Sequence, residues 1–160
     1  MSCKLVARGR RSAMAWTSFT ITLLLFSYGR AKETLELSDE IKEIIQHVHN
    51  ECVAKTGVAE EDITNCEKGI FKEDKKLKCY MFCLMEEANL IEDDGSVDYD
   101  MFLSIIPEQY TERASNMILG CKHHDSPDKD NCQRAFDVHK CSYAKDPDVS
   151  NIGIVNYIYK

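Results

Sequence analysis

Six of the eight cysteines have a spacing that suits disulfide chemistry. Gaps of 26, 3, 37, 10 and 8 residues separate, in order, Cys52, Cys79, Cys83, Cys121, Cys132 and Cys141. Cys79 and Cys83 are four residues apart, so on a helix both thiols project from one face and can reach different neighbouring elements. A disulfide between these two would close a single helical turn and constrain little of the unfolded chain. Spacing by itself leaves the remaining pairings open.

The first 31 residues have the pattern of a cleavable export signal. An uncharged stretch, residues 13–28, has an apolar centre and follows a basic head formed by Lys4, Arg8, Arg10 and Arg11. Gly29 and Ala31 then provide small residues just before the expected cleavage point. We expect cleavage after Ala31, which leaves residues 32–160 as one secreted domain. The uncharged stretch is marginal for crossing a bilayer, so a membrane anchor is the weaker interpretation.

Removal of this signal leaves an acidic chain. Residues 1–31 carry five of the 20 basic residues and none of the 27 acidic ones, so residues 32–160 have a formal charge of −12. Nucleic-acid binding requires clustered Lys and Arg, and we therefore exclude nucleic acid as a partner. An anionic membrane surface is excluded for the same reason. The mature length fits one domain with a modest core that disulfides supplement.

One cysteine is left over after export. Cys3 leaves with the signal, and Cys66 falls outside the six-member spacing. We expect Cys66 to remain a free thiol.

Apolar periodicity predicts six helices and almost no strand. The first begins after Ser38 and ends at Gly57, and Pro107 ends the fourth. The other expected helices span residues 60–68, 73–89, 98–105, 108–122 and 130–143. Ala88 is expected on the inward face of the third helix. The chain is thus expected to be all-α.

Several features occur together with this helix content. The cysteine spacing is joined by the run Leu77-Lys78-Cys79-Tyr80-Met81-Phe82-Cys83, an acidic turn at Asp93 to Gly95, and the ending His139-Lys140-Cys141. Together with secretion, they resemble the insect odorant-binding proteins of the general-odorant and pheromone-binding family. The resemblance extends over roughly residues 37–148.

The resemblance implies a fold and a pairing of the cysteines. The family fold is a six-helix bundle cross-linked by disulfides around an apolar cavity. In this family the first cysteine pairs with the third, the second with the fifth and the fourth with the sixth. Carried onto this chain, the bonds are Cys52–Cys83, Cys79–Cys132 and Cys121–Cys141.

The same resemblance implies which residues line the cavity. Those at matching positions are Tyr99, Phe102, Ile106, Ala114, Met117, Ile118, Phe136 and His139. Periodicity without the resemblance favours a plain hydrophobic core at these positions. Cross-links destabilise the unfolded state and let a bundle keep a hollow centre, and methionine gives adaptable walls.

Two regulatory features are also expected. The tail, residues 142–160, carries an apolar end that we expect to fold over the cavity as a lid, with a frayed terminus as the alternative. His139 lies beside the expected cavity wall, and an unperturbed histidine changes charge near pH 6.5. We expect ligand affinity to fall between about pH 7 and 5, although a purely structural His139 is an equal alternative.

Motifs for catalysis and metal binding are weak. Residues 121–125 match the Cys-x-x-His-Asp string of secreted phospholipase A2, but Pro127 interrupts the helix and no Gly-rich calcium loop precedes it. The cysteine gaps do not suit zinc in an exported chain. Around Gly95 a calcium loop would place Leu90 and Met101 where oxygen ligands are needed. We expect no enzyme activity, no cofactor and no metal.

The sequence therefore predicts a secreted carrier of small hydrophobic molecules such as odorants or pheromones. Its expected partners are that ligand and an odorant receptor, with a homodimer as an open option. A carrier of the same fold outside olfaction is one alternative, and a helical extracellular signalling protein with a solid core is another.

Overall fold

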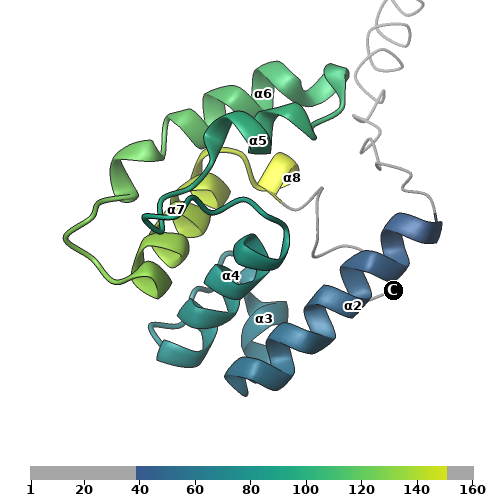
Figure 1. The fold of residues 1–160 in the computed structure, drawn as a ribbon, viewed down its shortest axis with the longest axis vertical. Helices are drawn as coiled ribbons and strands as arrows, with labels where there is room; N and C mark the ends of the chain where they lie inside the picture. The colour runs from purple at the N-terminus through teal and green to yellow at the C-terminus, as the bar shows by residue number, and fades with distance from the viewer. Residues whose placement is uncertain (1–38, 151–160) are drawn as a thin grey trace, which may run out of the picture. The chain divides into compact units, whose positions relative to one another are not determined.

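The computed structural model describes residues 39–150, for which all eight elements are helical. The helices are α2 (Asp39–Thr56), α3 (Glu60–Cys66), α4 (Lys75–Glu87), α5 (Tyr99–Ser104), α6 (Glu108–Leu119), α7 (Asn131–Lys145) and α8 (Pro147–Ser150), with a 3-10 turn η1 at Lys122–His124. In this part of the chain the only β feature is an isolated bridge between Ile91 and Val97. The all-α prediction is confirmed (Figure 1).

Aspartate caps define where three of these helices begin. Asp74 accepts hydrogen bonds from the backbone N–H groups of Lys76 and Leu77 at the start of α4. Asp98 and Asp130 cap α5 and α7 in the same way. Each carboxylate satisfies a donor of the first turn and faces the positive end of the helix dipole. The first turn of α3 has no such cap, because Ala59 precedes it.

Several predicted boundaries were wrong. The third predicted helix is shorter than residues 73–89, because Asp74 is its cap and Asn89 adopts a positive φ of 54° after its end. Ala88 is exposed at that end and does not face inward. The fifth predicted helix stops at Leu119 and not at Lys122, and η1 follows it. The four-residue helix α8 was not predicted.

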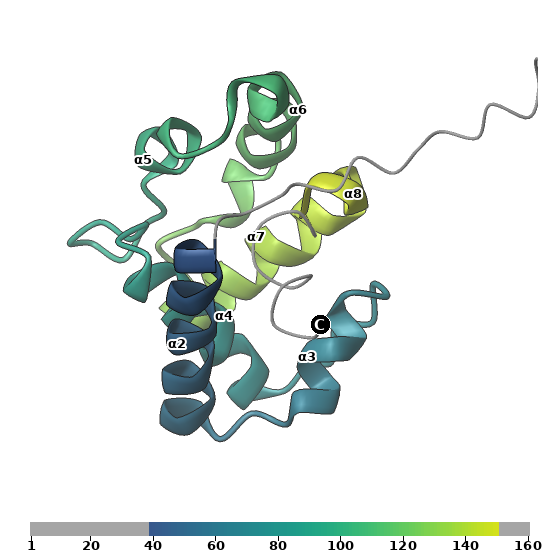
Figure 2. The same ribbon diagram turned by 90° about the vertical axis from the view of Figure 1, so that its right-hand side faces the viewer.

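Helices α4 and α7 form the centre of the packing. Helix α4 contacts both α2 and α7, whereas α5 packs against α6, and α6 contacts α7 and α8. In two perpendicular views, α4 and α7 lie between the α5–α6 pair and α3 (Figures 1 and 2). We refer to α5 and α6 together as the α5–α6 layer.

Three disulfides connect these helices. Cys52–Cys83 joins α2 to α4, Cys79–Cys132 joins α4 to α7, and Cys121–Cys141 joins the segment after α6 to α7. Cys66 is free and buried. The pairing that the family resemblance implied is confirmed, as is the free Cys66.

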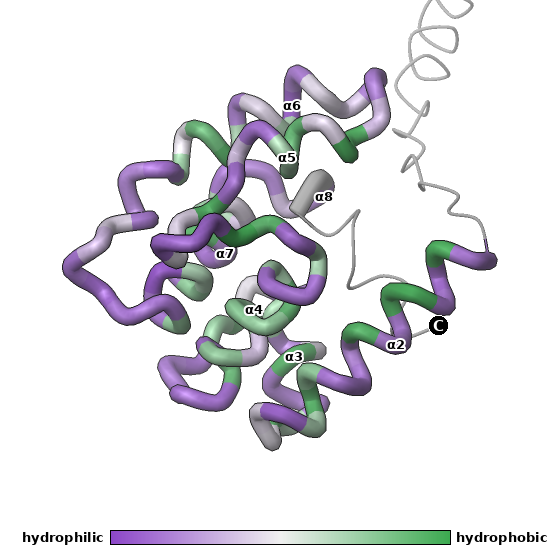
Figure 3. The backbone as a smooth tube through the Cα atoms, viewed as in Figure 1, coloured by the Kyte–Doolittle hydropathy of each residue, from purple (hydrophilic) through white to green (hydrophobic). Residues whose placement is uncertain are grey.

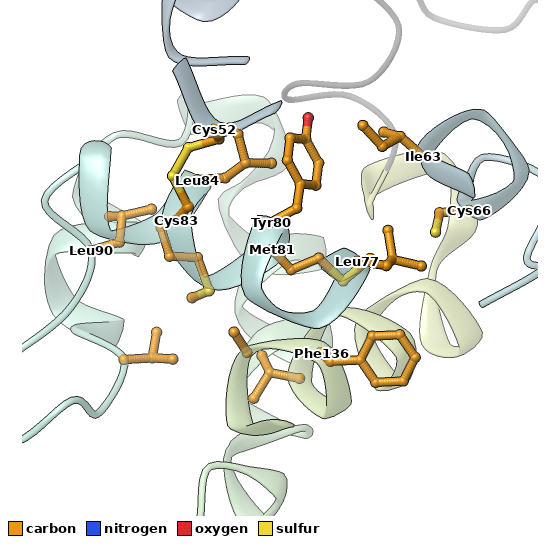
Figure 4. Packing of buried hydrophobic residues seen from close by; sticks show 14 of the residues in the cluster. Cys52, Ile63, Cys66, Leu77, Tyr80, Met81, Cys83, Leu84, Leu90 and Phe136 are labelled. Atoms are coloured by element: carbon orange, nitrogen blue, oxygen red, sulfur yellow. A yellow bond between two sulfur atoms is a disulfide. The ribbon is translucent and has the colours of Figure 1, made fainter. Parts of the chain in front are cut away.

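Most buried apolar side chains belong to one main cluster. It contains residues from α2, α3, α4 and α7, which gather around α4, together with Tyr99 of α5 and Ile118 of α6 (Figure 4). Leu77 and Phe136 are among its largest fully buried side chains. The ring of Phe136 also contacts Phe71 edge-on, at 6.0 Å between ring centroids. This cluster is the packed core of the protein.

The expected signal peptide and most of the expected tail lie outside the described residues. Residues 1–38 and 151–160 fall there. Within the tail, α7 continues to Lys145 and α8 follows, so the chain after the last cysteine begins as helix.

Candidate functional site

The eight residues expected to line a cavity fall into separate groups. Tyr99, Ile118 and Phe136 belong to the main cluster, and Phe102 packs against it. Ala114 and Met117 form a second cluster, against which Ile106 packs. His139 lies on α7. The predicted residues therefore lie on two apolar surfaces, the main core and the inner face of the α5–α6 layer.

The second cluster is small and comes mainly from α6. Ala114 is fully buried and Met117 is 4% exposed, three residues apart on one helical face. Met101, Ile105 and Leu119 point outward, since each is more than 40% exposed, whereas Tyr99, Tyr110 and Ile118 are buried. Tyr99 and Ile118 belong to the main cluster, so the layer contacts the core as well as carrying the separate second cluster.

Two connections hold α6 against α7. The Cys121–Cys141 disulfide joins the chain after α6 to α7. The Arg113 guanidinium donates Nη2 and Nε hydrogen bonds to the two carboxylate oxygens of Asp146, at 2.8 and 3.0 Å. A bidentate pair of this kind fixes orientation as well as distance. The position of α6 therefore does not depend on its small apolar cluster alone.

The buried face of α7 lies between these two surfaces. Cys132 bonds to α4 and Cys141 bonds toward α6, and a separation of nine positions is about two and a half turns, so they point in opposite directions. Around the helix, the buried side that lies between these two directions carries Arg134, Ala135, Val138, His139 and Ser142. This stretch of α7 faces the interior between α4 and α6.

His139 is the ionisable group on this face. Its Nδ1–H donates to the carbonyl oxygen of Ala135 at 2.8 Å, because a carbonyl can only accept. The neutral ring then carries its lone pair on Nε2. Burial lowers the pKa of His139, and the hydrogen bond to Ala135 opposes this shift only in part. The neutral form is therefore favoured in the folded protein.

A buried ion pair fixes the segment that leads into α5. Arg134 Nε donates to Asp125 Oδ1 at 2.7 Å, and both side chains are less than 10% exposed. The other Asp125 oxygen accepts from the Val97 N–H at 2.9 Å and the Tyr99 hydroxyl at 3.2 Å. Burial, followed by the charge of Asp125, raises the pKa of Tyr99. Asp125 is thus a structural residue, not the member of a catalytic pair.

Two other motifs are structural as well. His123 and His124 lie on η1 with their rings 4.1 Å apart, and neither is hydrogen-bonded to Asp125 in the structure described. In the core, His49 Nδ1 and Tyr80 Oη are 2.8 Å apart, and His49 Nε2 lies 3.3 Å from Glu60. Tyr80 is buried, so this chain of polar groups has no access for a substrate. Within residues 39–150, no group of three or more His, Cys, Asp or Glu could hold a metal ion.

Two surface pockets contain residues of the predicted set. One, of about 330 Å³, is lined by Arg113, Asn116, Met117, Lys145 and Asp146. The other, of about 320 Å³, contains Tyr99 and several carboxylates. Both are open to solvent, and each is lined mainly by polar or charged residues. Neither has the apolar lining of the expected cavity.

Helix α2 carries an apolar surface that the main cluster covers only in part. Ile41 and Ile44 are exposed, whereas Ile45 and Val48 are partly buried. Figure 3 shows several hydrophobic segments along α2.

Comparison with known proteins decides the family. The family model described as the PBP/GOBP family matches residues 34–145. The chain belongs to this family.

A curated relative and two solved structures support the same fold. General odorant-binding protein 69a of Drosophila melanogaster is 22% identical over 82% of this chain and 88% of its own length. Odorant-binding protein 7 of Anopheles gambiae, solved in complex with an azo compound, is 26% identical, with a TM-score of 0.64 over 73% of this chain and 94% of that one. An odorant-binding protein of Locusta migratoria is 25% identical, with a TM-score of 0.66 over 78% and 96% of the two chains.

This PBP/GOBP family member differs from its Anopheles neighbour in its cross-links. That neighbour has four disulfide bridges, whereas three are present in the described residues here. Burial raises the pKa of the Cys66 thiol to about 11, so this cysteine is an unreactive core residue at neutral pH. No described helix is long and apolar enough to span a membrane.

Sequence reasoning missed one polar residue on the inner face of α7. Ser142 is 5% exposed and lies one turn beyond His139 and Val138. Its position was visible as a polar residue in an apolar helical stripe, but the spacing could not show that its hydroxyl would be buried.

Proposed function

We propose that this PBP/GOBP family protein is a secreted carrier that binds small hydrophobic molecules between the α5–α6 layer and the α4–α7 core. The observation that supports this most is the separation of the second cluster, Ala114 and Met117, from the main cluster. Desolvation of a ligand between two such apolar surfaces contributes about 25 cal/mol per Å² of apolar area. The ligand site comprises the predicted residues Tyr99, Phe102, Ile106, Ala114, Met117, Ile118, Phe136 and His139.

Titration with the fluorescent apolar probe N-phenyl-1-naphthylamine tests this proposal. We expect saturable uptake of about one probe per protein, with a blue shift of its emission. Met117→Gln should weaken the binding about tenfold, because it places an amide on the inner face of α6. Leu119→Gln on the same helix is the matched control, since Leu119 is exposed. Uptake that does not saturate, or equal effects of the two variants, would contradict the proposal.

Export rests on the sequence pattern of residues 1–31. We propose that these residues are removed and that the protein acts outside the cell, in the fluid around sensory neurons. Expression of the full chain in eukaryotic cells should place the protein in the medium with Lys32 as its first residue. N-terminal sequencing measures this, and retention of residues 1–31 would refute it.

Delivery to a receptor is proposed to depend on pH and on the tail. Protonation of His139 would place a charge on the inner face of α7, beside bound apolar ligand, and select an opened state. Probe affinity should then fall between about pH 7 and 5 in the wild type but not in His139→Gln. Deletion of residues 149–160 should speed probe dissociation if the tail forms the proposed lid. Equal losses of affinity in both proteins would exclude His139 as the switch.

A further inference from the structure

Among the described residues, Ser142 has the one buried side-chain oxygen or nitrogen without a hydrogen-bond partner. The side chain is 5% exposed, on a helix whose other buried residues are mostly apolar. A buried hydroxyl that makes no hydrogen bond is costly, so native proteins rarely keep one without a use. The missing partner needs an explanation.

Other hydroxyls on these helices do find partners. Thr56, Thr64 and Thr111 each donate to the carbonyl oxygen of the residue four positions earlier, at 2.7, 2.9 and 3.3 Å. This local bond is the usual solution for a hydroxyl within a helix. Ser142 has the carbonyl of Val138 at the same spacing, yet its hydroxyl does not bond to it. The hydroxyl is therefore directed elsewhere.

The direction in which the Ser142 hydroxyl points follows from the position of Ser142 around α7. Ser142 lies on the buried side between Cys132, which bonds to α4, and Cys141, which bonds toward α6. Ala135 and His139 share this side of the helix. The hydroxyl thus lies on the buried side of α7, and α7 contacts α6, the helix that carries the second cluster, Ala114 and Met117.

We infer that Ser142 is the polar anchor of the ligand site, and that the preferred ligands are apolar chains or rings that carry one hydrogen-bonding oxygen. Alcohols, aldehydes, ketones and esters belong to this class, because a serine hydroxyl can donate to each of their oxygens. A pure hydrocarbon leaves the hydroxyl unsatisfied. This inference rests on the proposed function and specifies its ligand chemistry.

Competition against bound N-phenyl-1-naphthylamine tests the anchor. The competitors are 1-decanol and undecane, which have equal numbers of non-hydrogen atoms. The wild type should bind 1-decanol more tightly than undecane, and Ser142→Ala should weaken 1-decanol binding about threefold to tenfold, the range expected for one neutral hydrogen bond. Undecane affinity should stay unchanged. Ser142→Ala should also raise the melting temperature of the ligand-free protein, because it removes an unsatisfied hydroxyl.

Two further variants separate an anchor from a general effect of the substitution. Ser142→Thr keeps the hydroxyl and should retain most of the preference for 1-decanol. Ser104→Ala is the matched control, since its hydroxyl is exposed and already donates to the carbonyl of Met101 at 2.7 Å. That control should not alter either affinity.

The outcomes distinguish this inference from the function on which it rests. Probe uptake with a preference for 1-decanol that survives in Ser142→Ala would overturn the anchor and leave the carrier function standing. Equal affinities of the wild type for both competitors would overturn it as well. A protein that takes up no probe would contradict the carrier function and the anchor together.

Discussion

The α4–α7 core and the α5–α6 layer are held in place by different interactions. The core is filled by large side chains such as Leu77 and Phe136 and is crossed by the Cys79–Cys132 disulfide. The buried residues of α6 are Tyr110, Ala114, Met117 and Ile118, of which Ala114 and Met117 form a cluster separate from the main one. The place of α6 against α7 is set by the Cys121–Cys141 disulfide and by the Arg113–Asp146 pair.

The disulfide and the ion pair hold α6 in place in addition to its apolar contacts. A protein interior normally packs closely, and a helix that is free to move would settle against the core. A covalent cross-link and a bidentate ion pair fix the helix without requiring a filled interface. In the proposed carrier, one region supplies stability and the other accommodates the ligand.

The largest loss of stability is expected where the two regions meet. Asp125→Ala leaves the Arg134 guanidinium buried without its counter-charge, and should lower the free energy of unfolding by about 3–5 kcal/mol. Urea denaturation measures this loss. Asp128→Ala, an exposed carboxylate on the same loop, is the control and should leave stability nearly unchanged. If both variants were equally stable, the ion pair would not hold the junction.

Truncation of one residue in each region sharpens the comparison. Leu77→Ala opens a cavity in a filled core and should cost about 2–5 kcal/mol of unfolding free energy, while the folded fraction keeps its probe affinity. Met117→Ala should cost about 2 kcal/mol or less but weaken probe binding, because Met117 borders the proposed ligand site. If instead Met117→Ala caused the larger loss of stability in denaturation and Leu77→Ala the larger loss of probe affinity in titrations, the roles of the two regions would be the reverse of those proposed.

Removal of either of two disulfides should lower stability, but only one removal should also weaken ligand binding. Cys121→Ala/Cys141→Ala removes a link that spans 20 residues and should cost about 3 kcal/mol, with a loss of probe affinity as α6 moves. Cys52→Ala/Cys83→Ala removes a link of 31 residues between α2 and α4 and should cost about as much. That second variant should bind the probe normally once folded. An equal loss of probe affinity in the two double variants would mean that the position of the α5–α6 layer does not determine ligand binding.

The smallest effect concerns pH. Because burial lowers the pKa of His139, the folded protein binds this proton less readily than the unfolded chain does. Stability should therefore decline as the pH falls below about 6.5, the ordinary histidine value, and stop declining below the folded pKa. His139→Gln should flatten that decline, whereas His47→Gln, on an exposed part of α2, should not. Melting curves from pH 7 to 5 would show identical slopes if His139 had no such role.

The sequence was sufficient for most of the fold, because periodicity and covalent spacing are local signals. The helical class and the free Cys66 followed from apolar periodicity and cysteine spacing. Boundaries were less certain, since the cap at Asp74 and the end of α6 at Leu119 depend on backbone hydrogen bonds that composition does not reveal. The pairing of the disulfides came from the family resemblance and not from geometry.

The site was harder to predict than the fold. Periodicity shows that Phe136 and Met117 face inward, but it cannot show that one belongs to the main core and the other to a separate cluster. That distinction depends on how α6 is held across the interior by Arg113 and Asp146, which are 33 residues apart in sequence. The buried hydroxyl of Ser142 depends on the same tertiary arrangement.

The most direct test of the ligand site is an amide chemical-shift map of the isotopically labelled protein during titration with N-phenyl-1-naphthylamine. We predict saturable shifts at the inner-face residues of α6 and α7, with the largest at Ala114, Met117 and Ser142, while the amides around Leu77 on α4 change little. Shifts confined to exposed positions such as Leu119 and Ile70, or centred on the packed core, would contradict a ligand site between the layer and the core.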